Sequence, residues 1–400
     1  MKKFAILIIL VVVSGITIFW LGEFDRESAV DPEFSGNGSR LAELLGSDDI
    51  EGYSTALEPR DFRFPADHGP HPGFRNEWWY LTGNLDGEQG QRFGYELTFF
   101  RFALSPDVAG ATPRSAETQP VSNWRTNQVY IAHFAVTDEK NKQFHVAQRF
   151  SRGALGLAGA QDTPFKVWLE DWSIREIQVG NEAAAGTIQW ELTASAQDFA
   201  LHLNLMSEKQ PVLNGINGLS QKSATPGNAS YYYSISRLRS EGTLQVAGQD
   251  HTVSGLSWLD REWSSSALDA GQQGWDWFAL QLSDGSDLMF YNIRRNDGSQ
   301  DEHSAGTWIP RNGEVRYLSH DDVEIVITSE WESPEGGTYP SSWDIRVPGL
   351  DLALKVKPVI EDQELFTTVR YWEGAVDVSG QRYHQPIEGR GYVELTGYAR

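Results

Sequence analysis

The chain has 400 residues, of which 40% are hydrophobic and 12% aromatic, so it is long and apolar enough to bury real cores. Its 33 basic and 55 acidic residues give a net charge of −22, which repels nucleic acid and anionic lipid headgroups, so we expect no nucleic-acid partner. Cysteine is absent, which excludes disulfides, thiolate metal sites, cysteine nucleophiles and a lipoprotein anchor.

The N-terminus is predicted to direct export. Lys2 and Lys3 precede an uncharged apolar run, residues 4–21, that is longer than the usual signal-peptide core and just long enough to cross a thin bilayer. No clear small-x-small cleavage site follows this run. Residues 1–22 are therefore interpreted as a signal peptide or an N-terminal membrane anchor, and both alternatives stay open. With the lysines inside, we expect the rest of the chain to be extracytoplasmic, either periplasmic or secreted.

Residues 23–60 are predicted to form a flexible tether. They are rich in Ser, Gly, Asp and Glu, and their pattern offers at most one short helix, around residues 41–45.

From Phe62 onward, the sequence indicates β-strands. Short runs of alternating apolar and polar residues, bounded by turn residues, occur at 92–102, 128–138, 186–195, 199–207, 242–248, 277–294 and 351–358. The Asp284-Gly285 pair in the run at 277–294 predicts a hairpin turn. No window has a long helical period, so the pattern predicts an all-β fold, an antiparallel sandwich or barrel.

An internal repeat predicts two domains of one architecture. The segment EGTLQVAG at 241–248 matches EGAVDVSG at 373–380, and each copy is followed by another strand-like run. A fainter match relates the strand that starts at Trp79 to the one that starts at Trp277. We therefore expect an N-terminal β-domain at 61–260 and a C-terminal one at 261–400.

Seven sequence blocks in order resemble a known family. They are HPGFRNEWWYLTGNL, VYIAHFAVTD, ASYYYSISRL, VSGLSWLDREWSS, GWDWFALQLSDGSDLMFYNIR, YPSSWDIRVP and GYVELTGY, which together span residues 60–400. The blocks resemble the AttH-like proteins, the predicted secreted hydrolases related to the carotenoid 1,2-hydratase (hydroxyneurosporene synthase) family. This resemblance implies two tandem lipocalin-like antiparallel β-barrels. It also implies hydration of an isolated C=C bond in an isoprenoid chain for the carotenoid branch, and apolar polycyclic or phenolic substrates for related fungal members.

The chain departs from the hydratase pattern in one block. Where that branch reads Tyr-x-Asp-His-Asn-Trp, this chain keeps Asp260 and Trp263 but has Arg261 and Glu262 in place of His and Asn. The departure retains the carboxylate and changes its partners.

Four carboxylates beside aromatic residues are candidate acids. Adding water to an unactivated alkene requires a general acid, aromatic faces that stabilise a cation, and a held water molecule. Burial against an apolar wall raises a carboxyl pKa enough to keep the proton near neutral pH. We rank Asp260 first because it lies at the junction of the repeats, followed by Glu262, Asp276 and Glu77. The alternative for each is a structural ion pair that closes a barrel end with Arg75, Arg237, Arg261 or Arg294.

Aromatic residues and one histidine near these carboxylates are candidate ligand contacts. Because side chains alternate across a strand, Trp275 and Trp277 share one face and Asp276 points to the other, while Glu77 shares a face with Trp79. The candidate set is Trp79, Tyr80, His133, Tyr231, Tyr233, Trp258, Trp263, Trp275 and Trp277. Core packing is the alternative interpretation of each.

No cofactor or metal is indicated. His68 and His71 have a spacing that metal ligands use, but Gly and Pro flank them and no third ligand follows. The sequence also lacks a G-x-S-x-G elbow, an H-E-x-x-H motif, a P-loop and a dinucleotide glycine pattern.

These observations favour an exported protein that binds an apolar isoprenoid- or lipid-like molecule in an aromatic cleft and carries out hydratase-type chemistry there. A non-catalytic lipid carrier that works with an ABC-type exporter is the alternative. A structural scaffold, with the cleft filled by side chains, is a third hypothesis.

Overall fold

Strands make up nearly all of the regular structure. The computed structural model describes residues 50–106, 126–177, 187–266 and 268–399. Within these ranges, helical geometry is limited to short turns of 3₁₀-helix, η2 (Ala66–His68), η3 (His320–Asp322) and η4 (Pro348–Leu350). The predicted all-β fold is confirmed.

The first sheet contains 13 antiparallel strands in the order β4-β3-β2-β1-β13-β12-β9-β8-β7-β6-β5, with β10 and β11 paired to β12. Its strands are β1 (Asn76–Gly87), β2 (Arg92–Ala103), β3 (Gln128–Asp138), β4 (Gln143–Arg152), β5 (Ala158–Gln161), β6 (Lys166–Leu169), β7 (Trp172–Glu176), β8 (Gln189–Ser195), β9 (Phe199–Ser207), β10 (Val212–Leu213), β11 (Leu219–Gln221), β12 (Ala229–Val246) and β13 (Gln249–Ser264).

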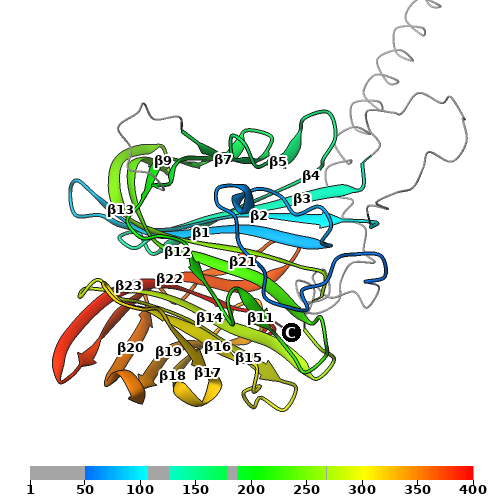
Figure 1. Ribbon diagram of the computed structural model, residues 1–400. Coiled ribbons are helices and arrows are strands. Elements are labelled where there is room, and N and C mark those ends of the chain that lie inside the picture. Colours follow the sequence, from blue (N-terminus) through cyan, green and yellow to red (C-terminus); the bar gives the residue numbers. More distant parts are fainter. Residues whose placement is uncertain (1–49, 107–125, 178–186, 267, 400) are drawn as a thin grey trace, which may run out of the picture. The chain divides into compact units, whose positions relative to one another are not determined.

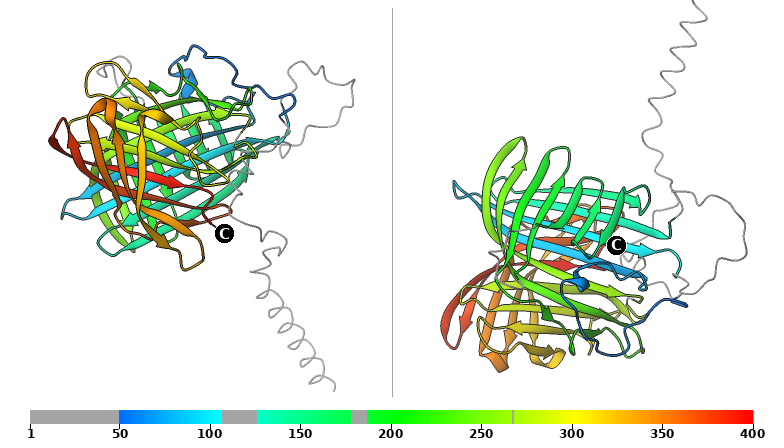
Figure 2. Two further views of the ribbon diagram at one scale, coloured as in Figure 1. Left: turned by 90° about the horizontal axis from the view of Figure 1, so that it is seen from below. Right: turned by 45° about the horizontal axis from the view of Figure 1, so that its top comes forward.

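The second sheet contains 10 strands in the order β17-β16-β15-β14-β23-β22-β20-β19-β18, with β21 paired to β22. Its strands are β14 (Gln272–Leu282), β15 (Asp287–Arg295), β16 (Ala305–Ile309), β17 (Arg316–Ser319), β18 (Glu324–Glu332), β19 (Thr338–Val347), β20 (Leu352–Pro358), β21 (Glu364–Phe366), β22 (Arg370–Arg382) and β23 (Gln385–Leu395). The first sheet curves into a nearly closed barrel and the second into a half-barrel (Figures 1 and 2).

The repeated segments occupy equivalent positions in the two sheets. EGTLQVAG lies in and just after β12, and EGAVDVSG lies in β22. In chain order, each of these is the next-to-last strand of its sheet. In the first sheet β1 pairs with β2 and β13, and in the second β14 pairs with β15 and β23 in the same way. The chain passes from one sheet to the other between Ser264 and Gln272. The division into domains at 61–260 and 261–400 stays a prediction.

Strand alternation gives each sheet two buried faces. On β1, Trp79 and Leu81 point into the core of the first barrel, whereas Tyr80 joins an apolar cluster that also contains Trp277 and Tyr392 of the second sheet. The second sheet has a core of its own around Trp343. The two sheets therefore pack against each other through their outer faces, and this shared layer positions the site described below.

The predicted hairpin at Asp284-Gly285 joins β14 and β15. Gly285 has a φ of +86°, which favours glycine, and its amide donates to the Leu282 carbonyl at 3.0 Å. Each of the other strand-like runs overlaps a strand of one of the sheets.

The last part of the predicted tether is packed against the first sheet. Ala56 is fully buried in the core, and the Tyr231 hydroxyl donates to the Glu58 carbonyl at 2.8 Å. The predicted export segment 1–22 and the helix expected around 41–45 lie outside the described residues. In the part of the chain that is described, no helix has the length and apolar character that a membrane crossing requires.

Candidate functional site

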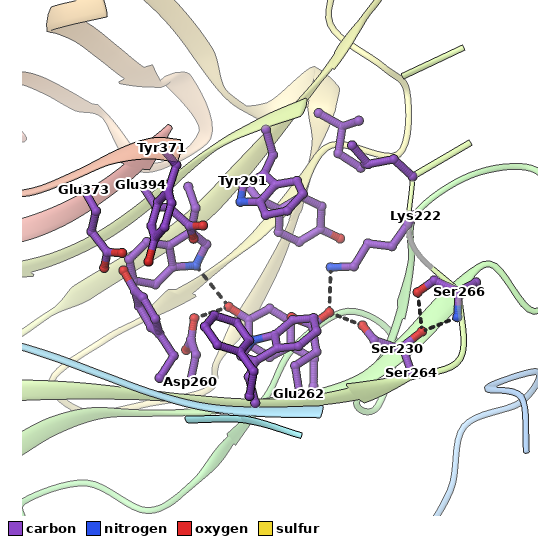
Figure 3. Close-up of a pocket in the computed structure, with 18 residues that line it drawn as sticks. Lys222, Ser230, Asp260, Glu262, Ser264, Ser266, Tyr291, Tyr371, Glu373 and Glu394 are labelled. Carbon is purple, nitrogen blue, oxygen red and sulfur yellow. Dashed lines mark hydrogen bonds and ion pairs between the residues drawn. The ribbon is translucent and has the colours of Figure 1, made fainter. Parts of the chain in front are cut away.

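A pocket of about 110 Å³ lies where the outer faces of the two sheets meet. From the first sheet and the segments that follow it, the pocket is lined by Trp78, Tyr80, Phe100, Lys222, Ser230, Tyr232, Asp260, Glu262, Ser264, Ser266 and Leu268. From the second sheet, it is lined by Trp275, Trp277, Tyr291, Ile293, Tyr371, Glu373 and Glu394. Figure 3 shows Glu373, Glu394 and Tyr371 together at one end and Lys222 with the serines at the other.

Asp260 has the environment that a proton-transfer residue requires. It is 3% exposed and accepts hydrogen bonds from the Tyr232 hydroxyl, the Ser234 hydroxyl and, at 2.7 Å, the Trp258 indole N–H. Burial raises the pKa of Asp260 to about 7, although these three donors act in the opposite direction. The carboxyl group can therefore gain or lose a proton near neutral pH.

Glu262 is held at the other end of the pocket. It accepts a hydrogen bond from Ser230 and pairs with the Lys222 ammonium at 3.1 Å. Burial alone would lower the pKa of Lys222, but the Glu262 carboxylate raises it above its usual value. The ammonium group also lies 4.0 Å from the centre of the Tyr291 ring.

The second sheet supplies the opposite wall. Trp275 and Trp277 share one face of β14, as alternation predicted, and the Trp277 indole N–H donates to the Tyr232 hydroxyl at 3.1 Å. Glu373 and Glu394 stand on β22 and β23 as direct cross-strand neighbours. The pocket thus combines aromatic faces, which stabilise a developing cation, with carboxyl groups, which transfer protons.

Glu77 does not line the pocket. It points into the first barrel, is 0% exposed, and forms ion pairs with Arg101 and Arg261. Burial would raise the pKa of Glu77, but the two guanidinium groups outweigh it and hold the pKa below its usual range. Its backbone partner is the amide of His71 at 3.0 Å. The structure therefore favours the structural alternative for this residue.

Asp276 also lies away from the pocket. Alternation turns it to the inner face of β14, where it pairs with Arg294 and accepts a hydrogen bond from the Tyr398 hydroxyl at 3.0 Å. The structure therefore favours the alternative interpretation of this catalytic candidate, a structural ion pair with Arg294.

Four of the aromatic candidates belong to the core of the first barrel. The Tyr233 hydroxyl lies 2.6 Å from His68 Nδ1, and the ring of Trp263 stacks on His71 at 3.7 Å between centroids. Alternation determines this placement, because residues one position away face the pocket instead. The four core residues are Trp79, Tyr231, Tyr233 and Trp263.

The remaining candidates are close to the pocket. Tyr80 lines it, Trp258 positions Asp260 from the side, and His133 Nδ1 lies 2.7 Å from the hydroxyl of the pocket residue Tyr371. Burial lowers the pKa of His133 to about 3, so this ring is neutral at physiological pH. In the described residues, no cluster of three or more His, Asp or Glu side chains is arranged to hold a metal ion.

Sequence reasoning missed several pocket residues. Glu373 follows Trp372 and begins the repeated EGAVDVSG segment, so the same carboxylate-beside-tryptophan signal was present there. Its counterpart in the other copy, Glu241, follows Ser240 and is exposed, so the tryptophan distinguishes the two glutamates. Lys222 and Tyr371 lie outside the seven family blocks, and Glu394 lies in the block GYVELTGY without a tryptophan beside it in the sequence.

Comparison with known proteins places the chain in a family. The sequence matches the AttH-like family over residues 55–398. A crystal structure of AttH from Nitrosomonas europaea is 32% identical, has a TM-score of 0.74, and covers 87% of this chain and 100% of its own.

Two more distant proteins have names that refer to the addition or removal of water. Kievitone hydratase from Nectria haematococca shares the fold at 17% identity and a TM-score of 0.62, with 87% of this chain and 97% of that chain covered. Dehydratase asqC from Emericella nidulans is 22% identical over 229 residues, which is 51% of this chain and 60% of the dehydratase. The match over nearly the whole described structure carries the assignment, and the chain belongs to the AttH-like family.

Proposed function

We propose that this protein is an enzyme of the hydratase or dehydratase type that adds water to, or removes it from, a small apolar substrate held between the two sheets. The observation that carries the proposal is Asp260, a buried carboxyl group in an aromatic pocket whose pKa of about 7 suits proton transfer at neutral pH. The names of the hydratase and dehydratase relatives support the same reaction class.

The volume of the pocket restricts the size of the substrate group that it can enclose. A cavity of 150 Å³ lined by apolar side chains holds a benzene molecule. At about 110 Å³, this pocket suits a five-carbon isoprenoid unit and is too small to enclose a long polyene. We therefore propose that the reacting part of the substrate is a short branched alkene or its tertiary alcohol.

The test uses the full chain with isoprene and with 2-methylbut-3-en-2-ol, its hydration product, and follows their interconversion by gas chromatography. We expect conversion in the wild-type protein and a loss of about 100-fold or more in Asp260→Asn, because Asn cannot transfer the proton. Glu88→Gln is the control, since Glu88 is exposed on the turn between β1 and β2.

Unchanged turnover in Asp260→Asn would remove Asp260 from the mechanism. Binding of either probe without any conversion would favour the alternative hypothesis of a non-catalytic carrier.

A further inference from the structure

Two glutamates of the second sheet face each other across the pocket wall. Glu373 on β22 and Glu394 on β23 are direct partners in the antiparallel ladder, and both line the pocket. Cβ atoms of such partners lie about 4.5–5.5 Å apart, and like charges at this separation repel. Two ionised carboxylates at this position are therefore unfavourable, and a shared proton relieves the repulsion.

No cation neutralises this pair among the described residues. Other buried carboxyl groups, such as Glu77 and Asp276, pair with arginine, whereas Glu96 and Asp260 have no such ion pair among the described residues. Glu373 is 0% exposed, and its nearest polar neighbours are the hydroxyls of Tyr80 and Tyr371, which lower its pKa without reaching ordinary hydrogen-bond geometry. The hydroxyl of Tyr80, on the facing wall of the same pocket, is buried and interacts with Glu373 across the pocket, also without ordinary hydrogen-bond geometry. Buried polar atoms in a pocket wall are groups that a ligand can satisfy.

The groups around the pair are carboxyls and phenols. Burial first, and then the carboxyl groups of Glu96 and Glu394, raise the pKa of Glu373 well above its usual value. Burial raises the pKa of Glu394 to about 8, with a contribution from Asp260 and Glu262. The nearby phenols are those of Tyr80, Tyr371 and Tyr392, and the cation that lines the pocket, Lys222, is paired with Glu262.

Asp260 on the facing wall has more hydrogen-bond donors than the pair. It accepts hydrogen bonds from Tyr232, Ser234 and Trp258, and donors of this kind stabilise the ionised form of a carboxyl group. Burial nevertheless raises the pKa of Asp260 to about 7, so its carboxyl group is present in both the ionised and the protonated form at neutral pH.

We propose that the Glu373–Glu394 pair is the proton donor of this pocket and that Asp260 acts opposite it as the base. The inference rests on the proposed function. In hydration, the O–H bond of the pair breaks and its proton forms a C–H bond with the alkene. A water molecule then bonds to the resulting tertiary cation and gives a proton to the Asp260 carboxylate. Solvent returns that proton to the pair, so one alkene and one water yield one alcohol, with no oxidation or reduction.

The protonation states of these groups matter for the direction of the reaction. Hydration needs a protonated pair and an ionised Asp260, whereas dehydration requires both groups in the opposite state. Because the pKa of Asp260 is raised to about 7, part of the free enzyme is in the state that hydration needs at neutral pH.

The first test needs no substrate. Infrared spectra of the full chain at pH 7 report the C=O band of protonated carboxyl groups. We expect this band in the wild-type protein, a weaker band in Glu373→Gln and in Glu394→Gln, and an unchanged band in Glu388→Gln, an exposed glutamate of the same strand β23. A band that is absent from the wild-type protein, or that both pair variants leave unchanged, would overturn the proposal.

The second test separates this proposal from the proposed function. Hydration of isoprene should fall about 100-fold or more in Glu373→Gln, and the wild-type rate should decrease as pH rises past about 8, where Glu394 ionises. If Glu373→Gln keeps the wild-type rate and pH profile while Asp260→Asn is inactive, the donor role is wrong and the proposed function stands. Glutamine matches the shape of a protonated glutamate, so loss of folding is not the expected cause of inactivity.

Discussion

Glu77 forms ion pairs with Arg101 and Arg261, whereas Asp260 accepts hydrogen bonds from neutral donors. Both carboxylates are buried, and both precede or follow a tryptophan closely in the sequence. The charge of the partners decides their chemistry, because a cation lowers a carboxyl pKa while burial among neutral groups raises it. At the residue scale, the partner and not the neighbouring tryptophan separates a structural carboxylate from a reactive one.

Replacing Glu77 by glutamine tests its structural role. The change leaves two buried guanidinium groups without a countercharge, so we expect the free energy of unfolding to fall by about 3–5 kcal/mol. Urea unfolding followed by circular dichroism measures the loss. The matched change Glu88→Gln, at an exposed position, should alter the unfolding free energy by less than about 0.5 kcal/mol. Equal stabilities of the two variants would contradict the structural role.

At the scale of the strand, alternation determines which side chains reach the pocket. On β12, Tyr231 and Tyr233 fill the barrel core and Tyr232 contacts Asp260. On β13, Asp260 and Glu262 face the pocket while the side chains between and after them face the core. Sequence periodicity shows which residues share a face. It does not show which of two buried faces holds the ligand, because both faces of these strands are apolar and aromatic.

Two neighbours on β14 provide a test of this alternation. Asp276→Asn breaks a buried ion pair with Arg294, so we expect a loss of about 3–5 kcal/mol in unfolding free energy with the turnover of the folded enzyme retained. Trp277→Leu removes an aromatic wall, so we expect KM for isoprene to rise about five- to tenfold. The two readouts are urea unfolding and steady-state kinetics at a temperature where both variants are folded. A large loss of turnover in folded Asp276→Asn would show that the inner face takes part in catalysis.

At the scale of the whole molecule, the layer between the sheets contains carboxyl groups whose pKa values are higher in the folded state than in the unfolded state. Asp260 has a pKa of about 7 and Glu394 of about 8, against ordinary values of 3.8 and 4.5. The folded state therefore binds more protons than the unfolded state, and stability falls as pH rises towards these folded values. The buried His68 and His133, with pKa values lowered to about 3, act in the opposite direction only up to the ordinary histidine value of 6.5.

We therefore expect stability to decrease between pH 6.5 and pH 8. In this pH interval, the same carboxyl groups are already ionised in the unfolded state. Each group that still holds its proton in the folded state lowers the free energy of unfolding by up to about 1.4 kcal/mol per pH unit. Urea unfolding at pH 6.5, 7.25 and 8 measures the slope, and Glu394→Gln should flatten it because glutamine does not ionise. An unfolding free energy that rises over this interval would contradict the buried-carboxyl interpretation.

The sequence alone determined the all-β class, the hairpin at Asp284-Gly285 and the equivalent strands of the two sheets. These features follow from local rules, since turn residues, alternation and repeated segments are each contained in a short stretch of chain. Only the tertiary structure decided that Glu77 and Asp276 form ion pairs, that Trp79 and Trp263 are core, and that Glu373 meets Glu394. The reason is physical: burial and the charge of a partner depend on residues up to hundreds of positions away, and the pocket exists only where the outer faces of two sheets meet.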